Sequence, residues 1–150
     1  MLKYTDTRIV FREIPNEITL AINISGCPNH CEGCHSPELW EDTGEELTYE
    51  VIDNLLKKYP AVTCVALMGG DNDTFEISVL ASCLLANSVK VAWYSGRDRI
   101  PDNITITDFD YIKLGPYISE LGPLDNPNTN QRLYQVKGLN LEDITYKFWK

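Results

Sequence analysis

The segment VTCVALM, Val62 to Met68, constrains the fold most, because it is a continuous apolar run that ends at a pair of glycines. Such a run is typical of a strand buried on both faces within a parallel sheet. An amphipathic helical pattern, LTYEVIDNLLKKYP, precedes it, with Thr48 as the cap and Pro60 as the stop. A second helical segment, TFEISVLASCLLANS, and another strand, Val89 to Ser95, follow it. This alternation predicts right-handed crossovers between parallel strands.

The rest of the chain predicts further short strands and a single domain. Two β-rich segments, Arg8 to Ile14 and Ile18 to Ser25, are joined through a PNE turn. After Arg99 the pattern loosens into FDYIKLGPY, TNQRLYQV and DITYKFW, which we interpret as short strands. A closed eight-stranded barrel needs at least ~200 residues. At 150 residues the chain is therefore expected to form one α/β domain, residues 1–150, with a mostly parallel sheet in a truncated, open partial (β/α) barrel.

Composition excludes several classes of function. The formal net charge is −9, which opposes binding to the phosphates of a nucleic acid. No apolar segment approaches the ~20 residues that a membrane-spanning helix requires, so we expect a soluble protein. The N-terminal segment MLKYTDTRIV has no signal-peptide pattern, and the five cysteines are an odd number. A reducing, cytoplasmic setting is therefore expected.

Three of the five cysteines, Cys27, Cys31 and Cys34, lie within eight residues, in the segment CPNHCEGC. Thiolates at positions i, i+4 and i+7 of such a loop can converge on one soft metal centre. The residues between them are polar, which argues against cysteines buried in a core. An iron–sulfur cubane normally takes four cysteines, so three leave one iron with an open position, as is typical of catalytic metal sites.

A structural zinc site is the alternative interpretation of these cysteines. Zinc would need a fourth ligand, either His30 or His35, or one of the distant cysteines Cys64 and Cys83. Both distant cysteines lie in apolar segments, where a free cysteine behaves as a small hydrophobic residue and packs in the core. A non-enzymatic zinc-binding interaction module therefore remains an alternative at this point.

The spacing in CPNHCEGC resembles that of the radical S-adenosylmethionine (SAM) superfamily. The longer segment GCPNHCEGCHSPELW, with His35, Ser36 and Trp40, looks like the glycyl-radical-enzyme activases. MGGD, Met68 to Asp71, is similar to the Gly-Gly-Glu/Asp motif at the end of the second core strand. LGPYISELGPL and TNQRLY resemble the C-terminal half of the activating subunits of anaerobic ribonucleoside-triphosphate reductases. The resemblance covers most of the chain, in order.

This resemblance implies a radical-SAM-type fold and a radical SAM oxidoreductase, with Cys27, Cys31 and Cys34 holding a 4Fe-4S cluster and SAM on the fourth iron. It implies that SAM is cleaved to a 5′-deoxyadenosyl radical, which takes a hydrogen atom from a glycine of the partner. The implied partners are the glycyl radical subunit of anaerobic ribonucleoside-triphosphate reductase and a low-potential electron donor such as flavodoxin or ferredoxin. Another radical SAM enzyme, acting on a small molecule, is the alternative.

Residues that follow the predicted strands have expected roles beside SAM. Gly69 and Gly70 let the backbone approach the methionine part closely, and Asp71 can accept a charge-assisted hydrogen bond from its amino group. The Ser95 hydroxyl can reach the SAM carboxylate or ribose, although YSGRD also fits a plain turn. Asp71 or Asp73 also fits as the cap of the next helix. His35 is expected to pack or hydrogen-bond near the cofactor, since hydrogen-atom transfer needs no general base.

Arg132, the last residue of the Asn-Gln-Arg signature, has three open interpretations. Its planar guanidinium can bind a carboxylate through two hydrogen bonds, or it can dock the partner protein. It can equally be an exposed strand arginine with no specific role.

Overall fold

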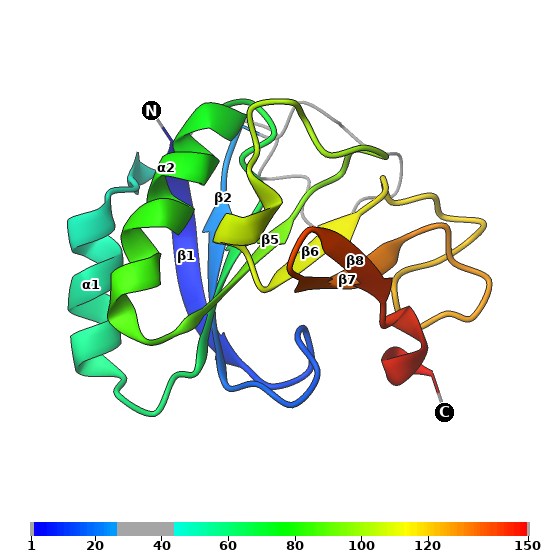
Figure 1. Ribbon diagram of the computed structural model, residues 1–150, viewed down its shortest axis with the longest axis horizontal. Helices are drawn as coiled ribbons and strands as arrows, with labels where there is room; N and C mark the ends of the chain where they lie inside the picture. The colour runs from blue at the N-terminus through cyan, green and yellow to red at the C-terminus, as the bar shows by residue number, and fades with distance from the viewer. Residues whose placement is uncertain (1, 27–43, 150) are drawn as a thin grey trace.

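The computed structural model describes residues 2–26 and 44–149 of the chain. In this part of the chain, eight strands form one sheet and two α-helices pack against it (Figure 1). The strands are β1 (Lys3–Val10), β2 (Thr19–Ile24), β3 (Glu45–Glu46), β4 (Cys64–Met68), β5 (Lys90–Tyr94), β6 (Tyr111–Leu114), β7 (Arg132–Lys137) and β8 (Asn140–Asp143). The helices are α1 (Tyr49–Lys58) and α2 (Thr74–Leu84).

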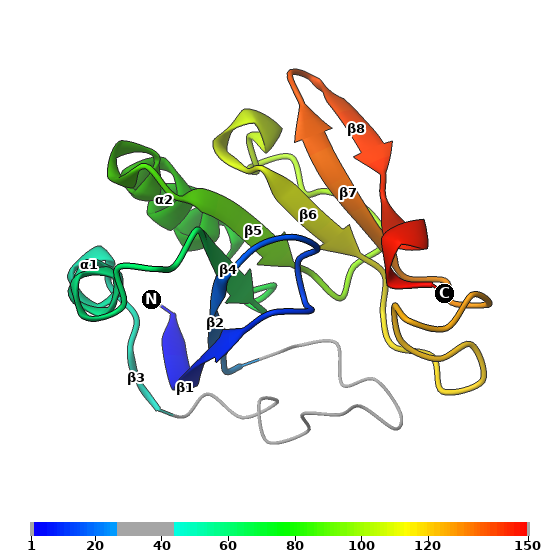
Figure 2. The same ribbon diagram turned by 90° about the horizontal axis from the view of Figure 1, so that it is seen from below.

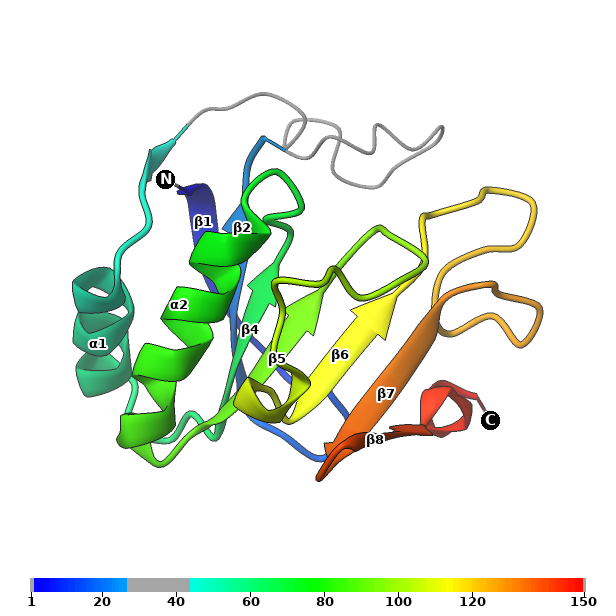
Figure 3. The ribbon, with the colours of Figure 1, turned by 45° about the horizontal axis from the view of Figure 1, so that its top comes forward.

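The sheet is mixed, with the strand order β3-β1-β2-β4-β5-β6-β7-β8. Its centre is parallel, because β2 pairs with β4, β4 with β5, and β5 with β6 in parallel. The β1–β2, β1–β3, β6–β7 and β7–β8 pairs are antiparallel. The carboxyl ends of β4, β5 and β6 therefore point the same way, toward the loops at the top of Figure 3. We call this rim of the sheet, just after β2, β4, β5 and β6, the carboxyl edge.

The two helices form where the sequence predicts them, and local capping explains their starts. At α1, the Thr48 hydroxyl accepts a hydrogen bond from the Val51 N–H, and the helix ends at Lys58, with Tyr59 as its C-cap directly before Pro60. At α2, the Asp73 carboxylate accepts a hydrogen bond from the Glu76 N–H. The cap of α2 is therefore Asp73 rather than Asp71.

Two of the predicted strands are wrong in position or type. The first strand runs from Lys3 to Val10, whereas Arg8 to Ile14 was predicted; Ile14 instead turns into the core. The final segment DITYKFW contains the 3-10 helix Thr145–Phe148, not a strand. The Asp143 carboxylate accepts hydrogen bonds from the Thr145 N–H and hydroxyl, a side-chain-capped turn that ends β8.

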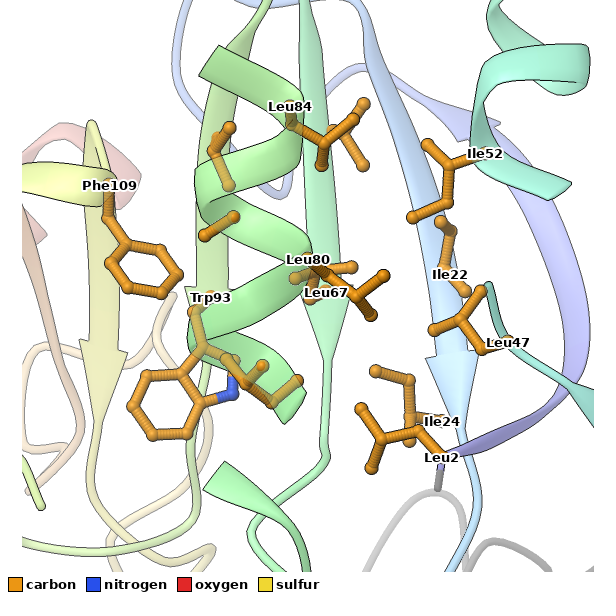
Figure 4. Close-up of a cluster of buried hydrophobic side chains, with 14 of the residues drawn as sticks. Leu2, Ile22, Ile24, Leu47, Ile52, Leu67, Leu80, Leu84, Trp93 and Phe109 are labelled. Atoms are coloured by element: carbon orange, nitrogen blue, oxygen red, sulfur yellow. The ribbon is translucent and has the colours of Figure 1, made fainter. Parts of the chain in front are cut away.

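The core has two layers, one on each face of the sheet. Both helices lie on the same face, and Figure 4 shows the large side chains between them and the strands, including Leu67, Leu80 and Trp93. The other face carries the small side chains Ala66 and Ala92 on β4 and β5, beside larger ones such as Tyr111 on β6. The segment between β1 and β2 crosses this second face (Figure 2), where its buried Ile14 side chain packs. The alanines bring this segment close to the sheet.

Candidate functional site

Gly69 joins the carboxyl ends of three neighbouring strands. Its N–H donates to the Tyr94 carbonyl at 3.0 Å, and its own carbonyl accepts a hydrogen bond from Trp93 Nε1 at 2.7 Å. The residue has φ +117°, and a Cβ built on it would lie 2.9 Å from the Ile24 carbonyl oxygen. Ile24 is the last residue of β2, three positions before Cys27. Glycine is therefore required here because the end of β2 lies against its backbone.

Gly70 is also required by packing. Its φ is +86°, and a Cβ on it would lie 2.5 Å from Cδ1 of Ile77 in α2. The close approach of β2 and α2 to the turn after β4 is therefore enough to explain why both positions are glycine. Close approach to a bound ligand, the reason expected from the sequence, stays a prediction.

The Asp71 and Ser95 side chains, which the sequence predicts to share a site, are in direct contact. The Ser95 hydroxyl donates to the Asp71 carboxylate at 2.6 Å, and the Gly96 N–H donates to its other oxygen at 2.8 Å. The Arg97 N–H donates to Ser95 Oγ at 3.1 Å. Asp71 and Ser95 are 4% and 1% exposed, so both polar groups are committed to contacts that fix the loop after β5. Recognition of a SAM amino group by Asp71 stays a prediction.

Lys113 is a buried cation at the same edge that the sequence reasoning missed. Its ammonium donates to the Ser95 carbonyl at 3.1 Å and to the Gly115 carbonyl at 2.8 Å, and lies 5.9 Å from the centre of the Tyr94 ring. These bonds tie together the ends of β5 and β6. The sequence does contain a sign of this role, a lysine within the short apolar segment YIKLG. A charged side chain in a buried strand needs polar partners, so such a lysine indicates a site where partners gather.

The hydroxyl of Tyr94 donates to the Glu13 carbonyl, in the segment that crosses the sheet. Burial is the main cause that raises the pKa of Tyr94, with the nearby Glu13 carboxylate adding to it. The Tyr94 side chain thus packs against the core on the face of the sheet opposite the helices. It serves as a neutral hydrogen-bond donor there.

The predicted metal ligands Cys27, Cys31 and Cys34, and the predicted cofactor residue His35, lie outside the described residues. Trp40 lies outside them as well. Within residues 2–26 and 44–149, no group of three or more histidine, cysteine, aspartate or glutamate side chains is placed to hold a metal.

The two distant cysteines are poor ligands for a metal held by the cysteine segment. Cys64 is the first residue of β4, at the opposite end of the strand from Gly69. Burial is the main cause that raises its pKa, with Glu17 and Asp110 adding to it, so the thiolate that zinc requires is disfavoured. Cys83 was predicted to pack in the core but is exposed on α2, on an outward-facing side that also carries apolar residues such as Phe75 and Val79. These positions weaken the zinc interpretation.

Arg132, the first residue of β7, pairs with Leu114 at the end of β6, so it lies at the carboxyl edge. Its Nη1 is 3.6 Å from the Asp143 carboxylate, and its guanidinium lies 5.7 Å from the centre of the Trp149 ring. Both contacts support a structural role at the β7–β8 end of the sheet.

A family model described as the 4Fe-4S single cluster domain matches residues 18–96, more than half of the chain. The chain therefore belongs to this family of iron–sulfur proteins. The matched stretch begins at β2, contains the cysteine segment and Gly69 to Asp71, and ends just after Ser95. No curated protein and no solved structure matches the chain. Among the described residues, no helix combines the length and apolar character needed to cross a membrane.

Proposed function

We propose that this protein is a radical SAM activase that installs a glycyl radical on anaerobic ribonucleoside-triphosphate reductase. The observation that carries the proposal is that β2, which precedes the cysteine segment in the chain, ends beside the Gly-Gly-Asp segment at one edge of the sheet. The cysteine segment begins three residues after Ile24, the end of β2, and the Gly-Gly-Asp segment follows β4, with Gly69 against Ile24. β2 and β4 are parallel neighbours, and such strand ends are where ligands of open α/β sheets bind.

The donor set fits the cluster that membership in the family supports. Three thiolates suit an iron–sulfur cluster, and the missing fourth cysteine leaves an iron position for a substrate. Cys27, Cys31 and Cys34 would hold this cluster, which when bound would supply the single electron for the reductive cleavage of SAM that precedes hydrogen-atom abstraction from the target glycine.

The protein's own residues have binding and positioning roles in this proposal. Gly69 to Asp71 bind the methionine part of SAM, and Ser95 borders the same site. The Asp71 carboxylate fixes the loop after β5, through Ser95 and Gly96, before any ligand arrives. Lys113 holds the ends of β5 and β6 together. Because these loops are already fixed, less free energy is lost in ordering them when a ligand binds and when hydrogen-atom transfer takes place.

The proposal is tested by mixing the anaerobically reconstituted protein with the reductase, SAM and a reductant, and recording the electron paramagnetic resonance spectrum. We expect a glycyl radical signal with the unmodified protein and none with Cys31→Ala. Cys83→Ala is the matched control, because Cys83 is exposed on α2 and outside the cysteine segment, and it should retain the signal. Cleavage of SAM without a glycyl radical on the reductase would contradict the activase and favour an enzyme acting on a small molecule.

A further inference from the structure

A pocket opens at the carboxyl edge beside the Asp71–Ser95 contact. Its volume is about 560 Å³, within the size range of ligand sites. The residues that line it include two arginines, one aspartate and three apolar residues: Arg97, Asp98, Arg99, Ile100, Pro101 and Pro116, together with Gly96. Apart from Gly96, whose N–H binds Asp71, none of these residues has a role in the proposed cofactor site.

Hydrogen bonds to residues of the carboxyl edge hold the backbone of this pocket in place. The Gly96 N–H donates to Asp71 at 2.8 Å, and the Arg97 carbonyl accepts from the Gly115 N–H at 2.7 Å. Arg97 Nη2 donates to the Asp71 carbonyl at 3.0 Å, which orients its guanidinium. The pocket is therefore built before a ligand binds, which reduces the entropy lost on binding.

The two arginines differ in how far they are already engaged. Arg97 Nε lies 4.0 Å from the Asp71 carboxylate, yet 48% of the Arg97 side chain is exposed. In the described part of the chain, Arg99 is exposed and its guanidinium has no hydrogen bond or ion pair. A guanidinium beside apolar groups such as Ile100 and Pro116 is typical of the residues that dominate protein–protein binding energy.

We propose that this pocket docks a carboxylate-bearing segment of the substrate protein, with Arg99 as its main contact; this rests on the proposed function. The substrate protein must reach the carboxyl edge to bring its glycine to the site, and the pocket lies on that edge. The chain's net charge of −9 repels acidic segments elsewhere, so two local cations select one orientation for an acidic segment.

The test measures association directly, by isothermal titration calorimetry of the cluster-loaded protein with the glycyl radical subunit of the reductase, without SAM. Arg99→Glu is compared with Arg12→Glu, which makes the same charge change at another exposed arginine. Arg12 lies between β1 and β2, at the end of the sheet opposite the carboxyl edge. We expect Arg99→Glu to raise the Kd about tenfold or more, and Arg12→Glu to change it less than about threefold. The visible absorbance of the cluster in each variant reports that it is folded.

Equal affinities of the two variants, or no association of the unmodified protein with the reductase, would overturn the proposal. A flavodoxin titration forms a second arm, and weakening of that complex alone by Arg99→Glu would overturn the choice of the substrate protein. The proposed function fails on a different readout, the absence of a glycyl radical with the unmodified protein. If the unmodified protein forms the glycyl radical but the Arg99→Glu variant binds the reductase with normal affinity, the proposed function is supported and the docking role of Arg99 is contradicted.

Discussion

At the scale of single residues, Gly69 has a position at the centre of the sheet that only glycine fits without strain. Its carbonyl accepts a hydrogen bond from the Trp93 indole N–H, and its own N–H donates one to the Tyr94 carbonyl. A Cβ at this position would clash with the Ile24 carbonyl oxygen. A backbone atom cannot rotate away as a side chain can, so any substitution must separate the ends of β2 and β4. The geometry of the turn after β4 therefore depends on this one residue.

Gly69→Ala is expected to lower the free energy of unfolding by about 3 kcal/mol, because it adds a clash with backbone to an unfavourable φ. The matched control is Gly138→Ala, whose φ is +64° and whose Cβ would meet nothing within 4 Å. That variant should cost only about 1 kcal/mol, the penalty of the left-handed conformation. Urea unfolding monitored by circular dichroism measures both, and equal costs would show that the contact with Ile24 is unimportant.

Residue-level predictions succeeded where the signal is local. Thr48 was predicted as a cap because capping involves only residues within one turn. The Ser95–Asp71 and Lys113–Ser95 contacts link residues 24 and 18 positions apart. They arise from the register of parallel strands, which sequence patterns do not specify. The sequence therefore predicts which residues reach the carboxyl edge, but not which of them bond to one another.

At the scale of elements, one buried carboxylate joins the starts of three central strands. Glu17 accepts hydrogen bonds from the Thr63 hydroxyl at 2.7 Å, from the Lys90 ammonium at 2.8 Å and from the Tyr111 hydroxyl at 2.8 Å. These residues lie at the starts of β4, β5 and β6, at the end of the sheet opposite the candidate site. Glu17 thus fixes the strand starts while Gly69 and Lys113 fix the strand ends.

The Glu17 contacts predict a specific dependence of stability on pH. Burial alone would raise the pKa of Glu17, but the hydrogen bonds from Lys90, Thr63 and Tyr111 outweigh it and hold the pKa below its ordinary value of 4.5. The carboxylate therefore stabilises the fold fully above about pH 4.5, and this contribution is lost as the pH falls through the lowered pKa. We expect Glu17→Gln to lower the free energy of unfolding at neutral pH by about 1–3 kcal/mol.

The measurement is urea unfolding of both proteins at neutral pH and near about pH 3.5, where the difference should shrink. Glu120→Gln is the control, because Glu120 is exposed in the loop after β6. It should change stability by less than about 0.5 kcal/mol at either pH. A difference between the unmodified protein and Glu17→Gln that stays constant with pH would contradict the role of this carboxylate.

The elements that the sequence predicted best are those with strong periodicity. Both helices and the buried strand β4 were confirmed, since their apolar spacing and caps agree. The start of β1 was missed because Lys3 to Asp6 offer little apolar alternation, and pairing with β2 and β3 makes this segment a strand. The final 3-10 helix was missed because its aromatic residues also suit a strand, whereas the Asp143 turn decides its conformation.

At the scale of the whole molecule, the site combines a local motif with a long-range arrangement. Membership in the 4Fe-4S single cluster domain family supports the cluster, and the three cysteines that would hold it lie within eight residues of the sequence. Gly69 to Asp71, Ser95 and Lys113 meet because four parallel strands end at one edge. The cysteine motif could be identified from the sequence alone, whereas the proximity of these residues could be identified only from the arrangement of strands in the sheet.

The iron and acid-labile sulfide content of anaerobically purified protein tests most directly whether the three-cysteine motif holds a cluster. We predict about four iron and four sulfide atoms per chain, as a 4Fe-4S cluster contains, and loss of both in Cys31→Ala. Cys83→Ala, at an exposed position outside the motif, should keep the full content. One tightly held zinc ion per chain without sulfide would contradict the account and indicate a structural metal site.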